Sequence, residues 1–432
     1  EIAESLTRTP ESTVAALRTA YVFLRPLRLE VLWTVRLLFF GNLEQDWREF
    51  VLRDLGVQRF EPYALRREMR LFQDRRAVDD TLTLGLARLS LRPVLVGRRH
   101  DAEALEVARS IASIALGRDD WHPRARPHAD RILAKVGRAL ERAGCREESL
   151  EVYARTSAPP ARERRCRVLE RLGRLDEALE LCDRIVAEPL DASEAEFGPR
   201  FAHRLRRKLG VEKAPWRRPR RPVEVLEVEP AILEPPRPAA EWLTLALLAE
   251  RGRVGIYSEN WLWRCLFGLA FWDVIFAPVP GAFAHPFQLG PLDLMSADFY
   301  PRRRAAVDAR LTELRGEPDL GARLGAVYGE KRGTANAFVA WHPQLEHTLR
   351  FAFEHIPGDA LATVCERIAL DPGRHRRGLP DVLVLEPGSP AGFELLEIKA
   401  PGDQLRPEQG AWIDYLNAAG IPAKVLRLRP VP

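Results

Sequence analysis

Two carboxylates near the C-terminus have the type and spacing that could bind a metal ion. Asp381 lies early in a strand-like run, residues 379–385, and Glu397 lies near the end of a second run, residues 392–399. The turn-forming cluster 387–390 separates the two runs, which predicts a β-hairpin. A hairpin centred in this cluster places Asp381 opposite Glu397, with Cβ atoms roughly 5 Å apart. Two carboxylates at that distance could share one divalent cation.

The charges near this hairpin indicate which cation would bind. Two facing carboxylates repel each other unless a positive charge offsets them. Strand alternation places Lys399 on the same face as Glu397, whereas Ile398 points into the core and leaves its backbone carbonyl as a further oxygen ligand. Oxygen ligands favour Mg²⁺ or Mn²⁺, as one or two ions, and no cluster of His or Cys offers zinc a better site. The alternative is a surface hairpin that carries ordinary charges.

Two further side chains could complete this site. Gln409 lies at the start of a predicted helix, on the same face as Trp412 and Ile413, and we expect it to reach back towards the carboxylates. Glu259 follows Ser258, a residue suited to capping a helix N-terminus. Glu259 is then either a further metal ligand or a carboxylate that interacts with the helix dipole, and Gln409 could instead be exposed to water.

Two arginine clusters could contact a DNA backbone. The first directly precedes Asp381, where it could bind phosphates near a scissile bond, and consists of Arg374, Arg376 and Arg377. The second lies on a predicted amphipathic helix over residues 64–72, opposite an apolar face with the spacing i, i+4, i+7. It consists of Arg66, Arg67 and Arg70. A solvated helix face explains the second cluster equally well.

The composition is that of an ordinary globular protein with several domains. The chain has 432 residues, of which 46% are hydrophobic and 29% charged, and its net charge of +5 permits polyanion binding. Its five cysteines form no CxxC pair, which favours a reducing cytoplasm over a disulfide framework or a zinc knuckle. The most apolar stretch, Trp261–Phe276, contains Arg264 and Asp273, so we expect a buried helix and no membrane span.

The middle of the chain is predicted to form helical repeats. The segment 143–152 recurs as 172–181, and each copy has a glycine where paired helices would turn. The segment 214–222 is rich in proline and arginine and must end this helical region. It is either a plain linker or a linker that also touches nucleic acid.

The C-terminal motifs resemble those of known nucleases. Pro380-Asp381 followed by Glu397-x-Lys399 is similar to the pattern of the PD-(D/E)xK nuclease superfamily. The wider set resembles the virus-type replication-repair nuclease (VRR-NUC) domain and, together with the helical repeats, a bacterial-type member of the Fanconi-associated nuclease family. The residues that carry this resemblance are 259–264, 269–276, 291–294, 298–300, 377–381, 396–403 and 409–412.

The resemblance implies a fold, a reaction and a set of site residues. The fold is a restriction-endonuclease-like α/β catalytic domain preceded by mainly α-helical domains, including a tetratricopeptide-like segment. The reaction is Mg²⁺- or Mn²⁺-dependent hydrolysis of 5′ flap or branched DNA, with 5′ to 3′ exonuclease activity, in interstrand crosslink repair. The implied metal ligands are Glu259, Asp381, Glu397 and the Ile398 carbonyl, with Lys399 as the catalytic lysine and Gln409 as the helix glutamine. The family usually has Asp-Arg where this chain has Asp403-Gln404, so phosphate contact there is in doubt.

The resemblance also divides the chain and suggests its partners. We expect a helical, SAP-like DNA-binding domain over residues 1–95, a tetratricopeptide-like domain over 96–212, a linker over 213–240 and the nuclease domain over 241–432. The expected partner is branched or flap DNA, bound by a monomer in the cytoplasm of a bacterium, near the nucleoid. Two other functions stay open, namely another branched-DNA endonuclease such as a junction resolvase, and a catalytically silent DNA-binding scaffold.

Overall fold

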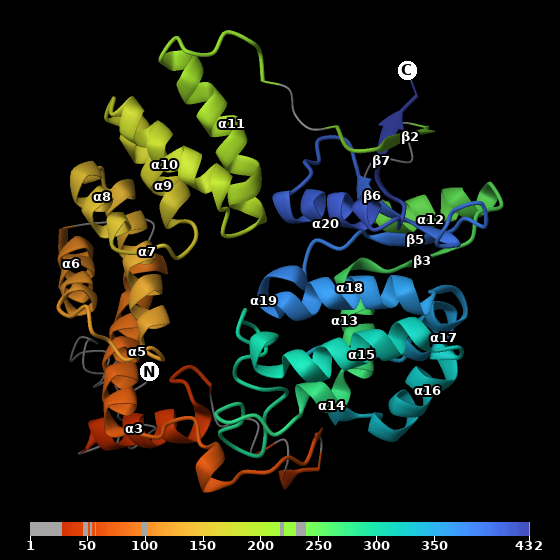
Figure 1. Cartoon of the computed structure of the whole chain (residues 1–432), viewed down its shortest axis with the longest axis horizontal. Helices are drawn as coiled ribbons and strands as arrows, with labels where there is room; N and C mark the ends of the chain where they lie inside the picture. Colours follow the sequence, from red (N-terminus) through yellow and green to blue (C-terminus); the bar gives the residue numbers. More distant parts are fainter. Residues whose placement is uncertain are drawn as a thin grey trace, which may run out of the picture.

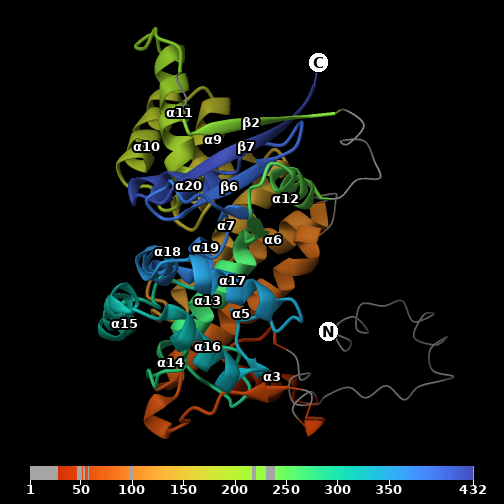
Figure 2. The ribbon, with the colours of Figure 1, turned by 90° about the vertical axis from the view of Figure 1, so that its right-hand side faces the viewer.

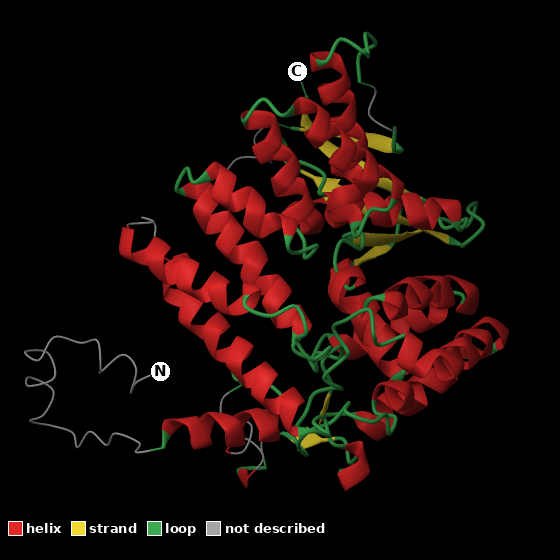
Figure 3. Cartoon of the chain, turned by 60° about the vertical axis from the view of Figure 1, so that its left-hand side comes forward, coloured by secondary structure: helices red, strands yellow, loops and turns green. Residues whose placement is uncertain are grey.

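The computed structural model consists of a column of helices beside an α/β half (Figure 1). It describes residues 28–45, 51, 54–56, 58–96, 102–216, 220–229 and 239–431. The strands gather mainly in the α/β half, whereas helices build the rest of the molecule (Figure 3). Two parts of the predicted linker, residues 217–219 and 230–238, and the first 27 residues lie outside the described residues.

The column is made of helices paired through tight turns. Its helices are α3 (Leu29–Phe40), α5 (Arg75–Val96), α6 (Ala102–Leu116), α7 (Arg126–Arg142), α8 (Arg146–Ala154), α9 (Ala161–Arg171), α10 (Leu175–Ala187) and α11 (Ala192–Lys208). Gly144 lies in the turn after α7 and has a φ of 86°, and Gly173 lies in the turn after α9 and has a φ of 77°. A side chain would strain the backbone at such positive φ angles, so glycine recurs where each helix pair turns. The predicted turns between paired helices are confirmed.

A buried carboxylate joins the helix pairs of the column. The side chain of Glu141, on α7, accepts hydrogen bonds from Arg138 at 3.1 Å, Arg171 at 3.0 Å and the Tyr153 hydroxyl at 3.1 Å, and it also pairs with Arg164. Burial alone would raise the pKa of Glu141, but the arginines around it lower that pKa below its usual value. The charge of Glu141 is therefore fully compensated inside the protein.

The amphipathic helix predicted over residues 64–72 does not form. Only a 3₁₀ turn, η1 (Arg67–Met69), is present, and the backbone on either side of it is extended. The Met69 carbonyl accepts a hydrogen bond from the amide of Gly281, in the α/β half, at 2.8 Å. This bond ties the extended segment to a loop of the α/β half. Leu71 and Phe72 at the end of the segment are buried, whereas Leu65 is exposed, so the predicted apolar face is not buried as a unit.

The α/β half contains a five-stranded mixed sheet. Its strands, in spatial order, are β2 (Val223–Val228), β7 (Ala423–Pro430), β6 (Phe393–Lys399), β5 (Val382–Leu385) and β3 (Gly255–Tyr257). The pairs formed by β3, β5 and β6 are antiparallel, whereas β6, β7 and β2 are mutually parallel.

Helices cover both faces of this sheet, with α12 on one face and α20 on the other (Figure 2). Alternate residues of β6 explain the two layers, because Leu396 and Ile398 pack towards α12 and Leu395 packs towards α20. The helices of this half are α12 (Ala240–Glu250), α13 (Glu259–Ala270), α14 (Trp272–Ile275), η3 (Pro301–Arg303), α15 (Arg304–Gly316), α16 (Leu320–Lys331), α17 (Leu345–His355), α18 (Gly358–Leu370), α19 (Pro372–His375) and α20 (Pro407–Ala418).

The apolar stretch Trp261–Phe276, which contains most of α13, is buried in the core. The charged residues that interrupt the stretch predict this burial. Within the described ranges, no helix has the length and apolar character needed to cross a membrane.

The two halves touch at both ends of the column. At one end, β1 (Arg59–Phe60) pairs with β4 (Thr334–Ala335), and the Tyr63 hydroxyl donates to the His285 carbonyl at 2.7 Å. At the other end, α11 contacts α20 (Figure 1).

Candidate active site

The predicted hairpin forms, and its register is the one expected from the sequence. Val382 pairs with Leu396 across β5 and β6, so Asp381 and Glu397 lie directly beyond this pair on opposite strands. The Ile398 amide donates to Asp381 Oδ2 at 2.8 Å, which fixes the carboxylate against β6. The prediction that Asp381 faces Glu397 is confirmed.

Glu259 joins this hairpin through the backbone at the start of α13. The amides of Ser258 and Glu259 donate to the Asp381 carbonyl at 2.8 Å and 3.0 Å. The Ser258 hydroxyl points instead to the Pro380 carbonyl, at 3.3 Å, so the predicted side-chain cap by Ser258 is wrong. Peptide groups of the strand entrance take the capping role, and they bring Glu259 next to Asp381.

Neighbouring side chains orient the Glu259 carboxylate. The Asn260 amide donates to Glu259 Oε1 at 2.9 Å, and the Tyr257 hydroxyl contacts Oε2. Burial, followed by the hydrogen bond to Glu259, raises the pKa of Tyr257 above its usual value. Tyr257 therefore stays protonated and donates to Glu259.

Lys399 connects the hairpin to α20. Its ammonium donates to Glu397 Oε1 at 2.7 Å and to Gln409 Oε1 at 3.2 Å. Gln409 Oε1 also accepts the Arg406 amide at 2.9 Å, which holds it at the first turn of α20. Gln409 thus reaches back to the carboxylates, as the helical face predicts.

The two facing carboxyls share a buried environment in which Lys399 is the nearest positive charge. Burial raises the pKa of Glu397 to about 8, with a further rise from the charge of Asp381 and an opposing effect of Lys399. Burial also raises the pKa of Asp381 to about 6, and the negative charges of Glu241 and Glu259 add to this effect. One lysine does not compensate so many acidic groups.

Glu241 is a residue that sequence reasoning missed. It lies in the first turn of α12, close to the site in space but far from the Asp381 motif along the chain. Its negative charge also raises the pKa of Tyr257, which places it within electrostatic reach of the same site. The only available signal was a carboxylate that begins an apolar helix, which many structural helices share.

The donor set fits a hard divalent cation. Glu397 Oε2 is buried and has no hydrogen-bond partner among the described residues, although a buried carboxylate oxygen normally has one. Carboxylate and carbonyl oxygens, the groups that Asp381, Glu397 and Ile398 offer here, are the kind that Mg²⁺ and Mn²⁺ accept. In the part of the chain that the structure describes, no three His, Cys, Asp or Glu side chains already converge in metal-binding geometry. Glu397 Oε1 already accepts from Lys399, so binding an ion requires the side chains to rearrange.

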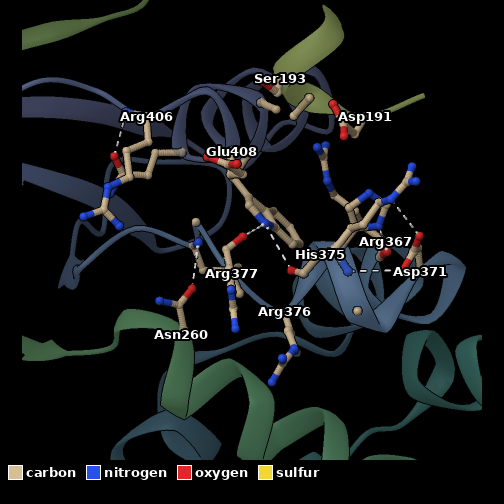
Figure 4. Close-up of a pocket in the computed structure, with 18 of the residues that line it drawn as sticks. Asp191, Ser193, Asn260, Arg367, Asp371, His375, Arg376, Arg377, Arg406 and Glu408 are labelled. Carbon is tan, nitrogen blue, oxygen red and sulfur yellow. Dashed lines mark hydrogen bonds and ion pairs between the residues drawn. The ribbon is translucent and has the colours of Figure 1, made fainter. Parts of the chain in front are cut away.

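A cavity of about 1000 Å³ opens beside the site and has a strongly basic wall (Figure 4). Glu259 and Gln409 line it together with Arg374, Arg376 and Arg377. The structure therefore brings the first arginine cluster next to the carboxylates.

The backbone of this basic loop is held in place by α20. Trp412 Nε1 donates to the carbonyls of Arg377 at 2.9 Å and His375 at 3.2 Å. Gly378 follows at φ 86°, and a Cβ there would come within 2.8 Å of the Glu408 backbone. Only glycine permits this close approach, so the loop packs tightly on α20 just before Asp381.

The second arginine cluster is not brought to this cavity. Arg66 and Arg70 line a different hollow, near α3, and all three side chains are exposed. The prediction that they share one helical face is wrong because no helix forms there.

Comparisons with known proteins agree with this geometry. The VRR-NUC domain family matches residues 320–430. A Fanconi-associated nuclease 1 homologue of Pseudomonas aeruginosa is 32% identical over 400 residues, which cover 91% of this chain and 68% of that protein. The chain belongs to the Fanconi-associated nuclease family. An Arabidopsis thaliana homologue is 33% identical over 183 residues, or 41% of this chain and 20% of that protein.

Solved structures of the family share the whole fold. The crystal structure of paFAN1 bound to 2-nucleotide 5′ flap DNA with a gap superposes with a TM-score of 0.81 at 29% identity, covering 98% of this chain and 77% of that one. A second structure, with 1-nucleotide 5′ flap DNA, gives 0.82. The fold class predicted from the sequence is confirmed. A nuclease with this carboxylate and lysine pattern implies dependence on a divalent metal ion.

Proposed function

We propose that this protein is a structure-specific nuclease that cuts 5′ flap and other branched DNA by divalent-metal-dependent hydrolysis of a phosphodiester. We further infer 5′ to 3′ exonuclease activity and a role in interstrand crosslink repair. The observation that carries the proposal is the facing pair Asp381 and Glu397, which is buried, short of positive charge and joined to Lys399. The relatives that resemble the whole chain are named as nucleases of this kind and were crystallised with flap DNA.

Three carboxylates and one carbonyl would hold the metal. These ligands are Asp381, Glu397, Glu259 and the Ile398 carbonyl, and Mg²⁺ or Mn²⁺ suits them, as one or two ions. When bound, such an ion polarises the phosphodiester and lowers the pKa of a water molecule. Glu241 adds negative charge to the same pocket and so favours cation binding.

Lys399 would assist the attack of water on phosphorus. Its ammonium is fixed between Glu397 and Gln409, so it can donate to the attacking water or to a phosphoryl oxygen that gains negative charge. Gln409 acts through Lys399 as a positioning residue.

Two groups of arginines would bind the DNA backbone. Arg374, Arg376 and Arg377 lie in the wall of the cavity beside the carboxylates, where they can hold phosphates near the scissile bond. Arg66, Arg67 and Arg70 are exposed on the helical half and would grip duplex DNA with little sequence dependence. We infer the division into domains at 1–95, 96–212, 213–240 and 241–432, a monomeric state and a location at the bacterial nucleoid.

Digestion of a set of DNA substrates tests this function. Purified protein is incubated with a 5′ flap, a matched unbranched duplex and a four-way junction, each with Mg²⁺, Mn²⁺ or EDTA. We expect metal-dependent cutting of the flap in preference to the other two. Preferred cutting of the junction would indicate a resolvase, and tight flap binding without any cutting in Mn²⁺ would indicate a silent scaffold.

A further inference from the structure

A second hollow, of about 790 Å³, follows one side of α11. We call it the α11 groove, and its walls come from α9, from α11, from Trp216 after α11 and from Pro407 at the start of α20. None of the side chains assigned to metal binding or catalysis lines it. Its chemistry is unusual for a structural crevice because basic side chains and aromatic rings alternate along it.

The groove carries an excess of positive charge. Its walls hold two carboxylates, Glu163 and Glu196, against five cations, which are Arg167, Arg200, Arg204, Arg207 and Lys208. A groove of this sign attracts a polyanion.

Two of these cations are available to a ligand, and two others already have a partner. Arg204 and Lys208 form ion pairs with Glu170, at 2.5 Å and 2.8 Å. Arg200 and Arg207 are exposed, and among the described residues no hydrogen bond or ion pair holds their side chains. A phosphate could therefore meet both arginines without breaking an existing ion pair.

Aromatic rings lie between these cations. The Trp216 side chain is 38% exposed, and its ring centroid lies 5.6 Å from that of His203. Deeper in the groove, Phe197 packs against Phe201 at 4.6 Å, with the Arg167 guanidinium 4.7 Å from the Phe197 ring. Phe201 is buried and Phe197 half-buried, so Trp216 is the ring that the groove exposes. An exposed ring beside arginines is a feature on which a base of a single strand stacks.

The α11 groove adjoins the cavity of the active site. Ser193 lines both hollows, and at the start of α20 Arg406 and Glu408 line the cavity while Pro407 lines the groove. Ser193 and Glu408 are both drawn at the rim of the cavity in Figure 4. The groove and the cavity therefore lie side by side at the contact between α11 and α20.

We propose that the α11 groove binds the single-stranded part of a 5′ flap, with phosphates on Arg200 and Arg207 and a base on Trp216. This inference rests on the proposed nuclease function and adds to it a site for the strand that is displaced from the duplex. Duplex DNA does not suit the groove, because paired and stacked bases cannot offer their faces to an aromatic ring.

Binding of single-stranded DNA tests the groove without any cleavage. Fluorescence anisotropy of a labelled oligothymidine in EDTA is compared for the wild type, Trp216→Ala, Trp216→Phe and the double variant Arg200→Ala/Arg207→Ala. We expect at least about fivefold weaker binding for Trp216→Ala and recovery of most of the affinity in Trp216→Phe, which keeps a ring. The double variant should flatten the salt dependence by about 0.7 in log–log slope for each arginine removed.

A matched control removes the same charge elsewhere on the helical half. Arg142 and Arg146 are exposed and line none of the hollows described above, so Arg142→Ala/Arg146→Ala should keep the affinity and salt slope of the wild type. Equal losses in both double variants would overturn the proposal, because they would indicate a general charge effect. Unchanged binding in Trp216→Ala would overturn it as well, and would leave the groove to a peptide ligand.

Flap length separates this proposal from the proposed function. The groove variants should lower cutting of a flap of about 15 nucleotides relative to a flap of one nucleotide, which is too short to reach the groove. An unchanged ratio would contradict the role of the groove even if both flaps are cut. A wild-type protein that cuts neither flap would contradict the nuclease function, and the anisotropy experiment would still decide whether the groove binds a single strand.

Discussion

Glu141 in the helical column and Glu397 in the sheet are equally buried, but the protein treats their charges in opposite ways. The Glu141 side chain is 2% exposed, and Arg164 and Arg138 outweigh its burial and lower its pKa. The Glu397 side chain is 1% exposed, burial raises its pKa to about 8, and one of its oxygens has no hydrogen-bond partner among the described residues. The first carboxylate is compensated by the fold itself. The second leaves a deficit of positive charge that a cation can fill, so burial alone does not distinguish a structural acid from a catalytic one.

The largest effect should be the loss of cleavage when Asp381, which faces Glu397, is replaced. Asp381→Ala removes a proposed metal ligand, so we expect cleavage to fall by about 10³-fold or more. DNA affinity should change little, because exposed arginines supply most of it. Cleavage rates and anisotropy measured on the same flap check both statements. A loss of binding equal to the loss of cutting would contradict this separation of roles.

Glu141→Ala should destabilise the helical column. It leaves Arg164, whose side chain is only 18% exposed, without its main partner, and we expect a loss of about 3 kcal/mol in the free energy of unfolding. This loss is small for the removal of a buried charge, because the side chains of Arg138 and Arg171 are 37% and 52% exposed and stay hydrated. Urea unfolding of the wild type and the variant gives this difference, which should be the same with Mg²⁺ and with EDTA. A difference between the two proteins that changes with metal would argue against a purely structural Glu141.

Metal addition should stabilise the wild type but not Glu397→Gln. A ligand at 100 times its dissociation constant adds about 2.7 kcal/mol to the folded state. The expected result is a higher melting temperature with Mn²⁺ than with EDTA in the wild type and in Glu141→Ala. Glu397→Gln should lose this shift, since an amide is a poor substitute for a carboxylate ligand. A full shift in Glu397→Gln would place the ion elsewhere.

The exposed cations of the helical half should affect binding and not chemistry. The triple change Arg66→Ala, Arg67→Ala and Arg70→Ala should weaken duplex binding about tenfold or more and lower the salt slope by about 0.9 for each phosphate that an arginine no longer neutralises. Titrations at several salt concentrations measure both quantities. An unchanged slope would mean that another surface grips the duplex.

The last expected effect is a loss of stability in acid, to which one histidine in each half contributes. Burial lowers the pKa of His285 to about 4, and burial together with Arg88 and Arg131 lowers that of His128 to about 4. The unfolded chain then binds more protons than the folded one as the pH falls from about 6.5 to 4, so stability drops by up to about 1.4 kcal/mol per pH unit for each histidine. Urea unfolding across this range should show a shallower slope in His128→Gln. An equal slope would exclude His128 as a cause.

The site could be predicted from sequence where the signal was local. The turn cluster and the alternation of β5 and β6 fixed the pairing of Asp381 with Glu397, and the glycines of the repeats fixed the turns at Gly144 and Gly173. The catalytic and metal-binding roles of these residues stay predictions.

The sequence failed where distant segments decide the structure. The segment with Arg66 has a helical pattern, but its backbone is extended at Arg66 and Arg70 and bonds to Gly281 of the α/β half. Ser258 is a good cap by type, yet the Asp381 carbonyl receives the amides at that helix start. Glu241 could not be identified because only the folded sheet brings it near Asp381.

The contacts at both ends of the helical column limit how this architecture can evolve. An open stack of helix pairs tolerates the gain or loss of a unit, since its free end simply moves. Here one end is tied to the α/β half through β1 and β4, and the other through α11 and α20. Inserting or deleting a helix pair would change the span between two fixed anchors and would break one of them. The number of repeats should therefore be set by the distance that the column must bridge.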